Sequence, residues 1–138
     1  MGHDEDMDRS DVELWVDGYE RAWRSAGTDA LGGLFSPDAS YRPSPWASPV
    51  QGVAAIARFW DHEREGPDEP FTMAREILAV DGATAVVRVS VDYGGDGAAP
   101  AERWRDLWII RFDDDGRCAA FEEWPFAPGQ RDGHEHSN

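Results

Sequence analysis

The chain has 138 residues, 28 of them acidic and 13 basic, and its formal net charge is −15. This length suits one domain with a single buried core, and the negative charge argues against nucleic acid or an anionic membrane surface as partners, because both would repel the protein. No long apolar run and no signal-peptide pattern occurs, so we expect a cytoplasmic protein without membrane contact.

The N-terminal part is predicted to be helical after a short tail. Residues 1–9 are polar and acidic, which favours a disordered tail. A helix is predicted to begin at Ser10, whose hydroxyl group could cap it, because Glu13 follows at the spacing of a capping box. Apolar side chains then recur with a helical period up to Gly27. They are Val12, Trp15, Val16, Tyr19, Trp23 and Ala26.

Two more helices are predicted before any long strand. The first spans residues 29–35 and is ended by Ser-Pro-Asp, after which residues 39–42 form a short extended piece. Three prolines keep the following loop from forming a helix. A third helix then runs from residue 52 to about residue 65, and a glycine- and proline-rich break follows at residues 66–70.

Four strands are predicted in the second half, where the apolar pattern changes to a period of two. They span residues 71–80, 85–93, 102–112 and 117–124, with a hairpin turn at Asp81-Gly82, a flexible loop at 94–100 and a turn at 113–116. Helices before strands predict an α+β fold, in which three N-terminal helices pack on a curved, mainly antiparallel sheet to form a cone. We expect one domain over residues 10–128 and a C-terminal tail over residues 129–138.

Several short motifs along the chain are similar to those of a known family. They are Trp15-x3-Tyr19-x3-Trp23, Leu34-Phe35-Ser36-Pro37-Asp38-Ala39, Gly52-x3-Ile56-x2-Phe59-Trp60, Asp106-Leu107-Trp108 and Phe121-Glu122-Glu123-Trp124. Together they resemble the SnoaL-like branch of the nuclear-transport-factor-2-like superfamily over residues 10–128. The resemblance implies the cone fold. It implies no single reaction, because the superfamily includes polyketide cyclases, limonene epoxide hydrolase, ketosteroid isomerase, dehydratases and non-enzymatic modules.

The aromatic side chains suggest what the cone would bind. Among the seven tryptophans, Trp15 and Trp23 lie on the first helical stripe and could simply fill the core. Trp46 and Tyr41 flank the proline-rich loop, where an aromatic side chain more often lines a pocket mouth. Such walls suit a small, flat, mostly apolar molecule. The candidate ligand-binding residues are Trp23, Trp46, Trp60, Trp104, Trp108 and Trp124.

Asp106 is the first candidate for chemistry. It shares a strand face with Trp104, Trp108, Ile110 and Phe112, so this face should point into the cone. Burial would raise the pKa of the carboxyl group, a state that suits a general acid or base. The alternative is a structural carboxylate paired with an arginine or a tyrosine.

Further polar candidates assist Asp106. Tyr19 or Tyr41 could donate a hydrogen bond beside it, as the oxyanion hole of ketosteroid isomerase implies. Arg105 follows the opposite face of the strand, so it cannot reproduce the Asp-Arg-Asp arrangement of the epoxide hydrolase. Of the adjacent Glu122 and Glu123, only one can face inward, and we favour Glu122 because it shares a face with Trp124.

No cofactor or metal is predicted. The segment 113–116 lacks the remaining ligands of a calcium loop, His62 is expected to be exposed, and His3, His134 and His136 lie in the tails. The single cysteine, Cys118, is expected to be buried rather than reactive, and it excludes an internal disulfide. All 13 basic residues are arginine, and this acidic, lysine-free composition fits both GC-rich coding and adaptation to salt.

Two functions therefore stay open. One is a cofactor-independent acid–base enzyme of the cyclase, isomerase, dehydratase or epoxide-hydrolase type. The other is a non-catalytic ligand-binding or interaction module. In either case a homodimer is expected through the outer sheet face, because that face of one strand mixes cations with Leu107 and Ile109. The cations are Arg103, Arg105 and Arg111.

Overall fold

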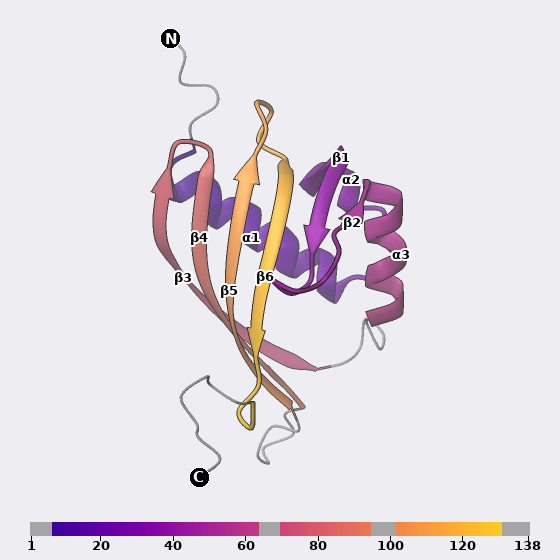
Figure 1. The fold of residues 1–138 in the computed structure, drawn as a ribbon, viewed down its shortest axis with the longest axis vertical. Helices are drawn as coiled ribbons and strands as arrows, with labels where there is room; N and C mark the ends of the chain where they lie inside the picture. The colour runs from indigo at the N-terminus through magenta and orange to yellow at the C-terminus, as the bar shows by residue number, and fades with distance from the viewer. Residues whose placement is uncertain (1–6, 64–69, 95–101, 131–138) are drawn as a thin grey trace.

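The computed structural model describes residues 7–63, 70–94 and 102–130, and over these residues the chain forms three helices and a six-stranded sheet (Figure 1). The elements are α1 (Arg9–Arg24), α2 (Leu31–Leu34), β1 (Phe35–Arg42), β2 (Val50–Gln51), α3 (Val53–Glu63), β3 (Phe71–Asp81), β4 (Thr84–Tyr93), β5 (Glu102–Phe112) and β6 (Cys118–Phe126). The strand order is β2-β1-β6-β5-β4-β3. The expected α+β class and the mainly antiparallel sheet are therefore confirmed.

Helix α1 begins earlier than the sequence pattern predicted. Asp8 caps it: its Oδ1 accepts a hydrogen bond from the backbone N–H of Asp11 at 2.9 Å, and the Asp11 carboxylate accepts one from the backbone N–H of Asp8 at 3.2 Å. Ser10, the predicted cap, lies inside the helix instead. Two overlapping pairs have capping-box spacing here, and the pair whose cap is an aspartate forms.

The segment between α1 and α3 differs most from the prediction. The helix expected over residues 29–35 is a single turn, α2, which contains two glycines that disfavour helix. Strand β1 begins directly after it and pairs parallel with β6, with a register shift between Phe35 and Ser40. Strand β2, which was not predicted, pairs antiparallel with β1. The expectation of three packed helices is thus only partly met.

The second half forms the predicted antiparallel meander with small shifts. The turn between β3 and β4 is one residue later than expected, at Gly82-Ala83, and Gly82 has a φ of 61° that glycine accommodates without strain. Strand β6 continues to Phe126, beyond the expected end at residue 124. Parts of two predicted connections, residues 64–69 and 95–101, lie outside the described residues, as do residues 1–6 and 131–138 of the predicted tails.

The core lies between the sheet and the helices. Helix α1 crosses one face of the sheet, and α3 lies beside the β1–β2 edge (Figure 1). The indole N–H of Trp15 donates to the carbonyl oxygen of Leu34 at 2.9 Å, which ties α1 to α2. Arg75 on β3 pairs with Glu13 of α1 at 2.9 Å, which ties α1 to the far strand of the sheet. These contacts hold α1 over the concave face and leave one end of it accessible.

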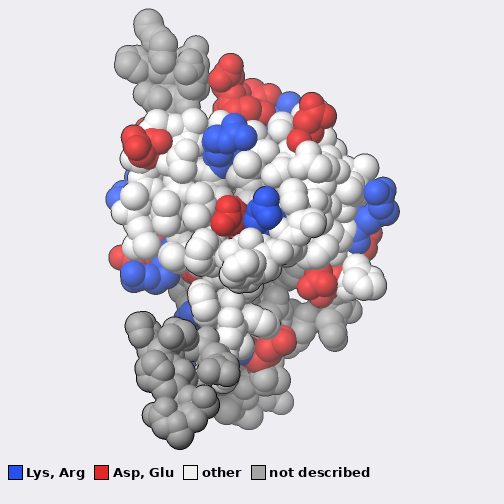
Figure 2. Space-filling model, in the orientation of Figure 1, with Lys and Arg blue, Asp and Glu red and all other residues white. Residues whose placement is uncertain are grey.

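The other sheet face carries no helix and is turned to the viewer in Figure 2, where uncharged side chains surround a few acidic and basic ones near the middle. Leu107 of β5 is 36% exposed and Trp124 of β6, its partner across the ladder, is 37% exposed. The two long apolar side chains are therefore adjacent on the outer face. None of the described helices is long and apolar enough to cross a bilayer.

Candidate functional site

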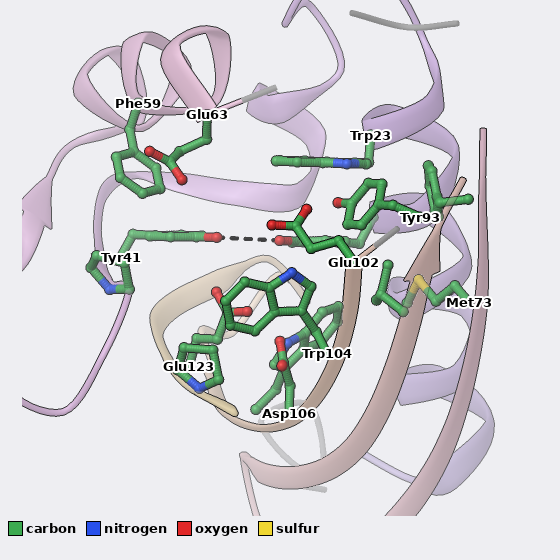
Figure 3. Close-up of a pocket in the computed structure, with 16 residues that line it drawn as sticks. Trp23, Tyr41, Phe59, Glu63, Met73, Tyr93, Glu102, Trp104, Asp106 and Glu123 are labelled. Carbon is green, nitrogen blue, oxygen red and sulfur yellow. Dashed lines mark hydrogen bonds between the residues drawn. The ribbon is translucent and has the colours of Figure 1, made fainter. Parts of the chain in front are cut away.

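A pocket of about 340 Å³ opens at the end of the concave face. It is lined from α1, β1, α3 and all four strands of the meander (Figure 3). The lining residues are Tyr19, Trp23, Tyr41, Pro43, Phe59, Glu63, Phe71, Met73, Val91, Tyr93, Glu102, Trp104, Asp106, Trp108, Glu123 and Pro125. The walls are thus mostly aromatic, with four carboxyl groups and three tyrosines as the main polar groups.

Asp106 lies inside the cone, as alternation along β5 predicted. It is 6% exposed and lines the pocket together with Trp104 and Trp108. Burial raises the pKa of its carboxyl group above the ordinary value of 3.8, and interactions with Glu123 and Trp108 lower it in part. Although these groups are close, neither Oδ1 of Asp106 nor Nε1 of Trp108 has a hydrogen-bond partner among the described residues.

Glu123, and not the favoured Glu122, is the second carboxyl group of the pocket. Glu122 points to the outer face, where its Oε2 accepts a hydrogen bond from the indole N–H of Trp124 at 2.7 Å. Burial raises the pKa of Glu123 well above 4.5, and Asp106 and Glu63 raise it further. Because their interaction lowers the pKa of Asp106 and raises that of Glu123, the proton of the pair stays on Glu123 and Asp106 ionises first.

Glu122 was favoured because it shares a face with Trp124, and that shared face is the outer one. A β-bulge determines which face of β6 points inward. Phe112 pairs with Cys118, but Arg111 pairs with Ala120, so one extra residue of β6 is inserted between these two pairs. The insertion reverses the alternation, and Phe121 rather than Ala120 faces inward. Phe121 is 1% exposed, which fixes the orientation of Glu123 two residues later.

Tyr19 and Tyr41 form the polar pair opposite the carboxyl groups. Their hydroxyl oxygens are 3.2 Å apart, and either can be the donor. Burial is the first cause that raises the pKa of each tyrosine well above 10, so both hydroxyl groups stay protonated. One hydrogen serves the mutual bond, and the other hydroxyl can donate to a ligand. Both tyrosines therefore lie where the sequence placed them, inside the pocket.

The six candidate tryptophans divide into three groups. Trp23, Trp104 and Trp108 line the pocket as expected. Trp60 is fully buried, with its ring centroid 5.0 Å from that of Tyr19, and belongs to the core behind the wall. Trp46 is 96% exposed and Trp124 lies on the outer face, so neither lines the pocket. These last three assignments to the pocket were wrong.

Sequence reasoning also missed two acidic residues for which a signal existed. Glu102 shares its strand face with Trp104 and Asp106, and alternation would have placed it in the pocket. Glu63 follows Phe59 by one helical turn on α3, so the two share a helix side. Figure 3 shows both carboxyl groups beside the pocket, together with those of Asp106 and Glu123.

The remaining candidate groups from the sequence lie outside the pocket. Cys118 is fully buried, and burial raises the pKa of its thiol, as expected for an unreactive cysteine. Residues 113–116 form the predicted turn, in which the Asp113 carboxylate accepts hydrogen bonds from the backbone N–H groups of Asp115 and Arg117. His62 is exposed, as expected. Within the described ranges, no group of three or more His, Cys, Asp or Glu side chains is placed to hold a metal ion.

Comparison with solved structures finds the same fold in several bacterial proteins. A candidate polyketide cyclase from Sinorhizobium meliloti is 28% identical, with 85% of this chain and 99% of that chain covered and a TM-score of 0.61. A candidate ketosteroid isomerase from Kribbella flavida is 21% identical, with coverage of 90% and 79% and a TM-score of 0.63. The epoxide hydrolase/cyclase-like enzyme SalBIII, described in pyran ring formation in the polyether salinomycin, is 15% identical, with coverage of 86% and 93% and a TM-score of 0.66.

The family of the chain follows from a direct match. Comparison with the curated proteins gave no match. The model of the SnoaL-like domain, in contrast, matches residues 16–121, which is most of the chain and includes both tyrosines and Asp106. The order of elements, the curved six-stranded sheet and the structural neighbours agree with this match. The chain belongs to the SnoaL-like family of the nuclear-transport-factor-2-like superfamily.

Proposed function

We propose that the pocket is the active site of a cofactor-independent acid–base enzyme that acts on a small, mostly apolar molecule. The observation that carries this proposal is the carboxyl pair of Asp106 and Glu123, which lies in an aromatic pocket and has raised pKa values. Two such groups can share a proton and pass it to and from a ligand.

The geometry gives the two carboxyl groups different roles. Asp106 ionises first, so its carboxylate removes a proton from the ligand, while Glu123 holds a proton that it can return. A hydroxyl group of the Tyr19–Tyr41 pair donates a hydrogen bond to the oxygen that gains negative charge. Cyclisation, isomerisation, dehydration and epoxide opening all use such proton transfers. The names of the cyclase-like and isomerase-like structural neighbours support this reaction class.

A non-catalytic binding module is the second candidate, and one observation favours it. Arg105 lies on the outer side of β5, where it pairs with Asp92 at 3.0 Å. The Asp-Arg-Asp arrangement expected of the epoxide hydrolase is therefore missing among the described residues that line the pocket. A pocket without that arrangement would still bind a ligand between its aromatic walls.

Hydrogen–deuterium exchange separates the two candidates without knowledge of the natural substrate. Small cyclic ketones in D2O, followed by NMR, report removal of a proton from the carbon beside the carbonyl group. We expect the wild-type protein to accelerate exchange and Asp106→Asn to lower the rate at least about a hundredfold, a typical contribution of a general base. Glu122→Gln, the matched control on the outer face, should keep the wild-type rate. Ketone binding without accelerated exchange would support the binding module.

We also propose that the protein forms a homodimer through the outer sheet face. The exposed neighbours Leu107 and Trp124 lie on β5 and β6, the two central strands of the sheet. Apolar side chains of this size are better placed in a contact than in water. Light scattering should give twice the mass of one chain, and Leu107→Glu should give the mass of one chain. A wild-type monomer at micromolar concentration would contradict the proposal.

A further inference from the structure

All charged residues that line the pocket, among those the structure describes, are acidic. Glu63 comes from α3, Glu102 and Asp106 from β5, and Glu123 from β6, so three elements contribute carboxyl groups to one cavity (Figure 3). The chain contains no lysine, and none of the described arginines lines the pocket. An anionic ligand would meet only like charge here, and it is disfavoured for that reason.

The nearest described arginines have other partners. On the outer side of β5, Arg103 and Arg105 both pair with Asp92. Arg24 pairs with Glu20 at 2.8 Å, and its guanidinium carbon lies 3.8 Å from the ring centroid of Phe71. Phe71 is itself a wall residue, so an aromatic ring of the pocket already binds a cation on one side.

The walls between the carboxyl groups are aromatic. The rings of Trp23, Phe59, Tyr93 and Trp104 line the same cavity as the four carboxyl groups. An aromatic face attracts a positive charge within about 6 Å of its centre, and a wall of several rings strengthens this attraction when water is displaced. Carboxylates and aromatic faces together form the surroundings in which an ammonium group binds most favourably.

Asp106 adds an independent observation. It is 6% exposed, it lines the pocket, and its Oδ1 has no hydrogen-bond partner among the described residues. A buried carboxyl oxygen without a donor is costly, and the cost is removed when a ligand supplies an N–H group or a positive charge. This buried acidic group is therefore placed to receive a cationic donor.

We propose that the ligand of this pocket carries a positively charged nitrogen, an amine or ammonium group, on an apolar body. This inference rests on the proposed ligand-binding role of the pocket and names its substrate class. The apolar body packs between the aromatic rings, and the nitrogen lies among the carboxyl groups. The ligand thus differs from a neutral apolar molecule by its positive charge, and binding experiments can isolate the effect of that charge.

Two probes of the same shape test the charge alone. The cation 4-(trimethylammonio)benzyl alcohol and its neutral isostere 4-tert-butylbenzyl alcohol differ by the replacement of nitrogen with carbon. We expect the cation to bind the wild-type protein at least about tenfold more tightly by isothermal titration calorimetry, in the range of a desolvated cation–π contact. Equal or weaker binding of the cation, or no binding of either probe at millimolar concentration, would overturn the inference.

Single substitutions test whether the carboxyl groups of the pocket cause the preference for the cation. Glu102→Gln and Asp106→Asn should each weaken binding of the cation about five- to tenfold, because each removes a carboxylate from the pocket. Unchanged binding of the neutral isostere by Glu102→Gln would also show that the pocket is intact. Glu122→Gln removes the same charge from the outer face, one residue away from Glu123, and should change neither affinity. Loss of cation binding in all three variants to the same extent would mean that net charge, and not the pocket, attracts the probe.

The affinity for the cation should change with pH in one direction. The titratable groups that face the cavity are the four carboxyl groups and the phenols of Tyr19, Tyr41 and Tyr93, and the phenols carry no charge below about pH 8. Ionisation of the carboxyl pair adds negative charge as the pH rises, so affinity for the cation should rise with pH, while affinity for the neutral isostere stays flat. A flat profile for both probes would count against the inference. The ketone exchange rates are measured separately, so failure of the charge test leaves the proposed acid–base activity standing.

Discussion

The charged residues on the two faces of strand β5 have opposite surroundings. On the outer face, Arg103 and Arg105 are exposed and share Asp92 as their partner. On the inner face, Asp106 is buried, and among the described residues it meets another carboxyl group, Glu123, and no cation. Water screens the charges of the first set, whereas burial raises the pKa of both carboxyl groups of the second set.

This contrast indicates which carboxyl groups carry function. A surface ion pair contributes little to stability, so it says little about chemistry. A buried carboxyl pair without a cation costs free energy of folding, and the fold retains it together with a pocket and two buried tyrosines. Acid–base chemistry or recognition of a cation would make use of such a pair.

The largest expected effect concerns the packing beneath the pocket. Trp60 is fully buried, and its ring centroid lies 4.7 Å from that of Trp23, a wall residue. Trp60→Ala should lower the free energy of unfolding by about 3–5 kcal/mol, because it removes a large buried side chain and leaves a cavity. Trp46→Ala, at a residue that is 96% exposed, is the matched control and should change it by less than about 0.5 kcal/mol. Urea denaturation followed by far-UV circular dichroism measures both, and equal effects would contradict the placement of the two side chains.

The sequence alone predicted the inner face of β5 because that strand contains no irregularity between Glu102 and Phe112. Its alternation of large apolar residues around Asp106 could be extended without error. Strand β6 carries an aromatic residue on each face, Phe121 on one and Trp124 on the other, so alternation alone could not identify the inner face. Trp124 suggested the wrong face, because it is 37% exposed on the outer side of the sheet. Periodicity therefore located one half of the carboxyl pair and missed the other.

Residue periodicity also failed to predict the elements outside the meander. Strand β2 has two residues, and the parallel pairing of β1 with β6 joins segments about eighty positions apart, so neither has a local pattern to predict it. Trp46 follows prolines that indicate a loop but do not indicate its direction. The hydrophobic periodicity predicted the order of the long helices and the meander strands correctly, because these elements are long amphipathic segments.

A second prediction tests the inner carboxyl group through the pH dependence of stability. The folded-state pKa of Asp106 is raised above 3.8, so the unfolded chain ionises first and stability falls as the pH rises through this range. Asp106→Asn removes this loss. We expect the variant to gain stability relative to the wild type, and this gain should grow as the pH rises above 3.8, the ordinary pKa of the carboxyl group.

Thermal unfolding of both proteins across this pH range measures the difference. At pH 3, where the carboxyl group is protonated in both the folded and the unfolded state, the gap between the two proteins should be smallest. A gap that is constant with pH would show that Asp106 does not ionise against a burial penalty.

The smallest expected effect is on the outer face and has the opposite sign. Hydrogen bonds from Arg105 and Arg103 lower the pKa of Asp92, so this carboxylate contributes stability above pH 3.8 that is lost as the pH falls through its lowered folded-state value. Asp92→Asn should therefore lower the thermal midpoint slightly at pH 7, and the difference from the wild type should vanish in strong acid. Because Asp92 lies at the surface, about 1 M NaCl should also remove the difference, whereas the effect of Asp106→Asn should persist in that salt. If salt removed both effects equally, Asp106 would be as accessible to water as Asp92, and the contrast between the two faces of β5 would fail.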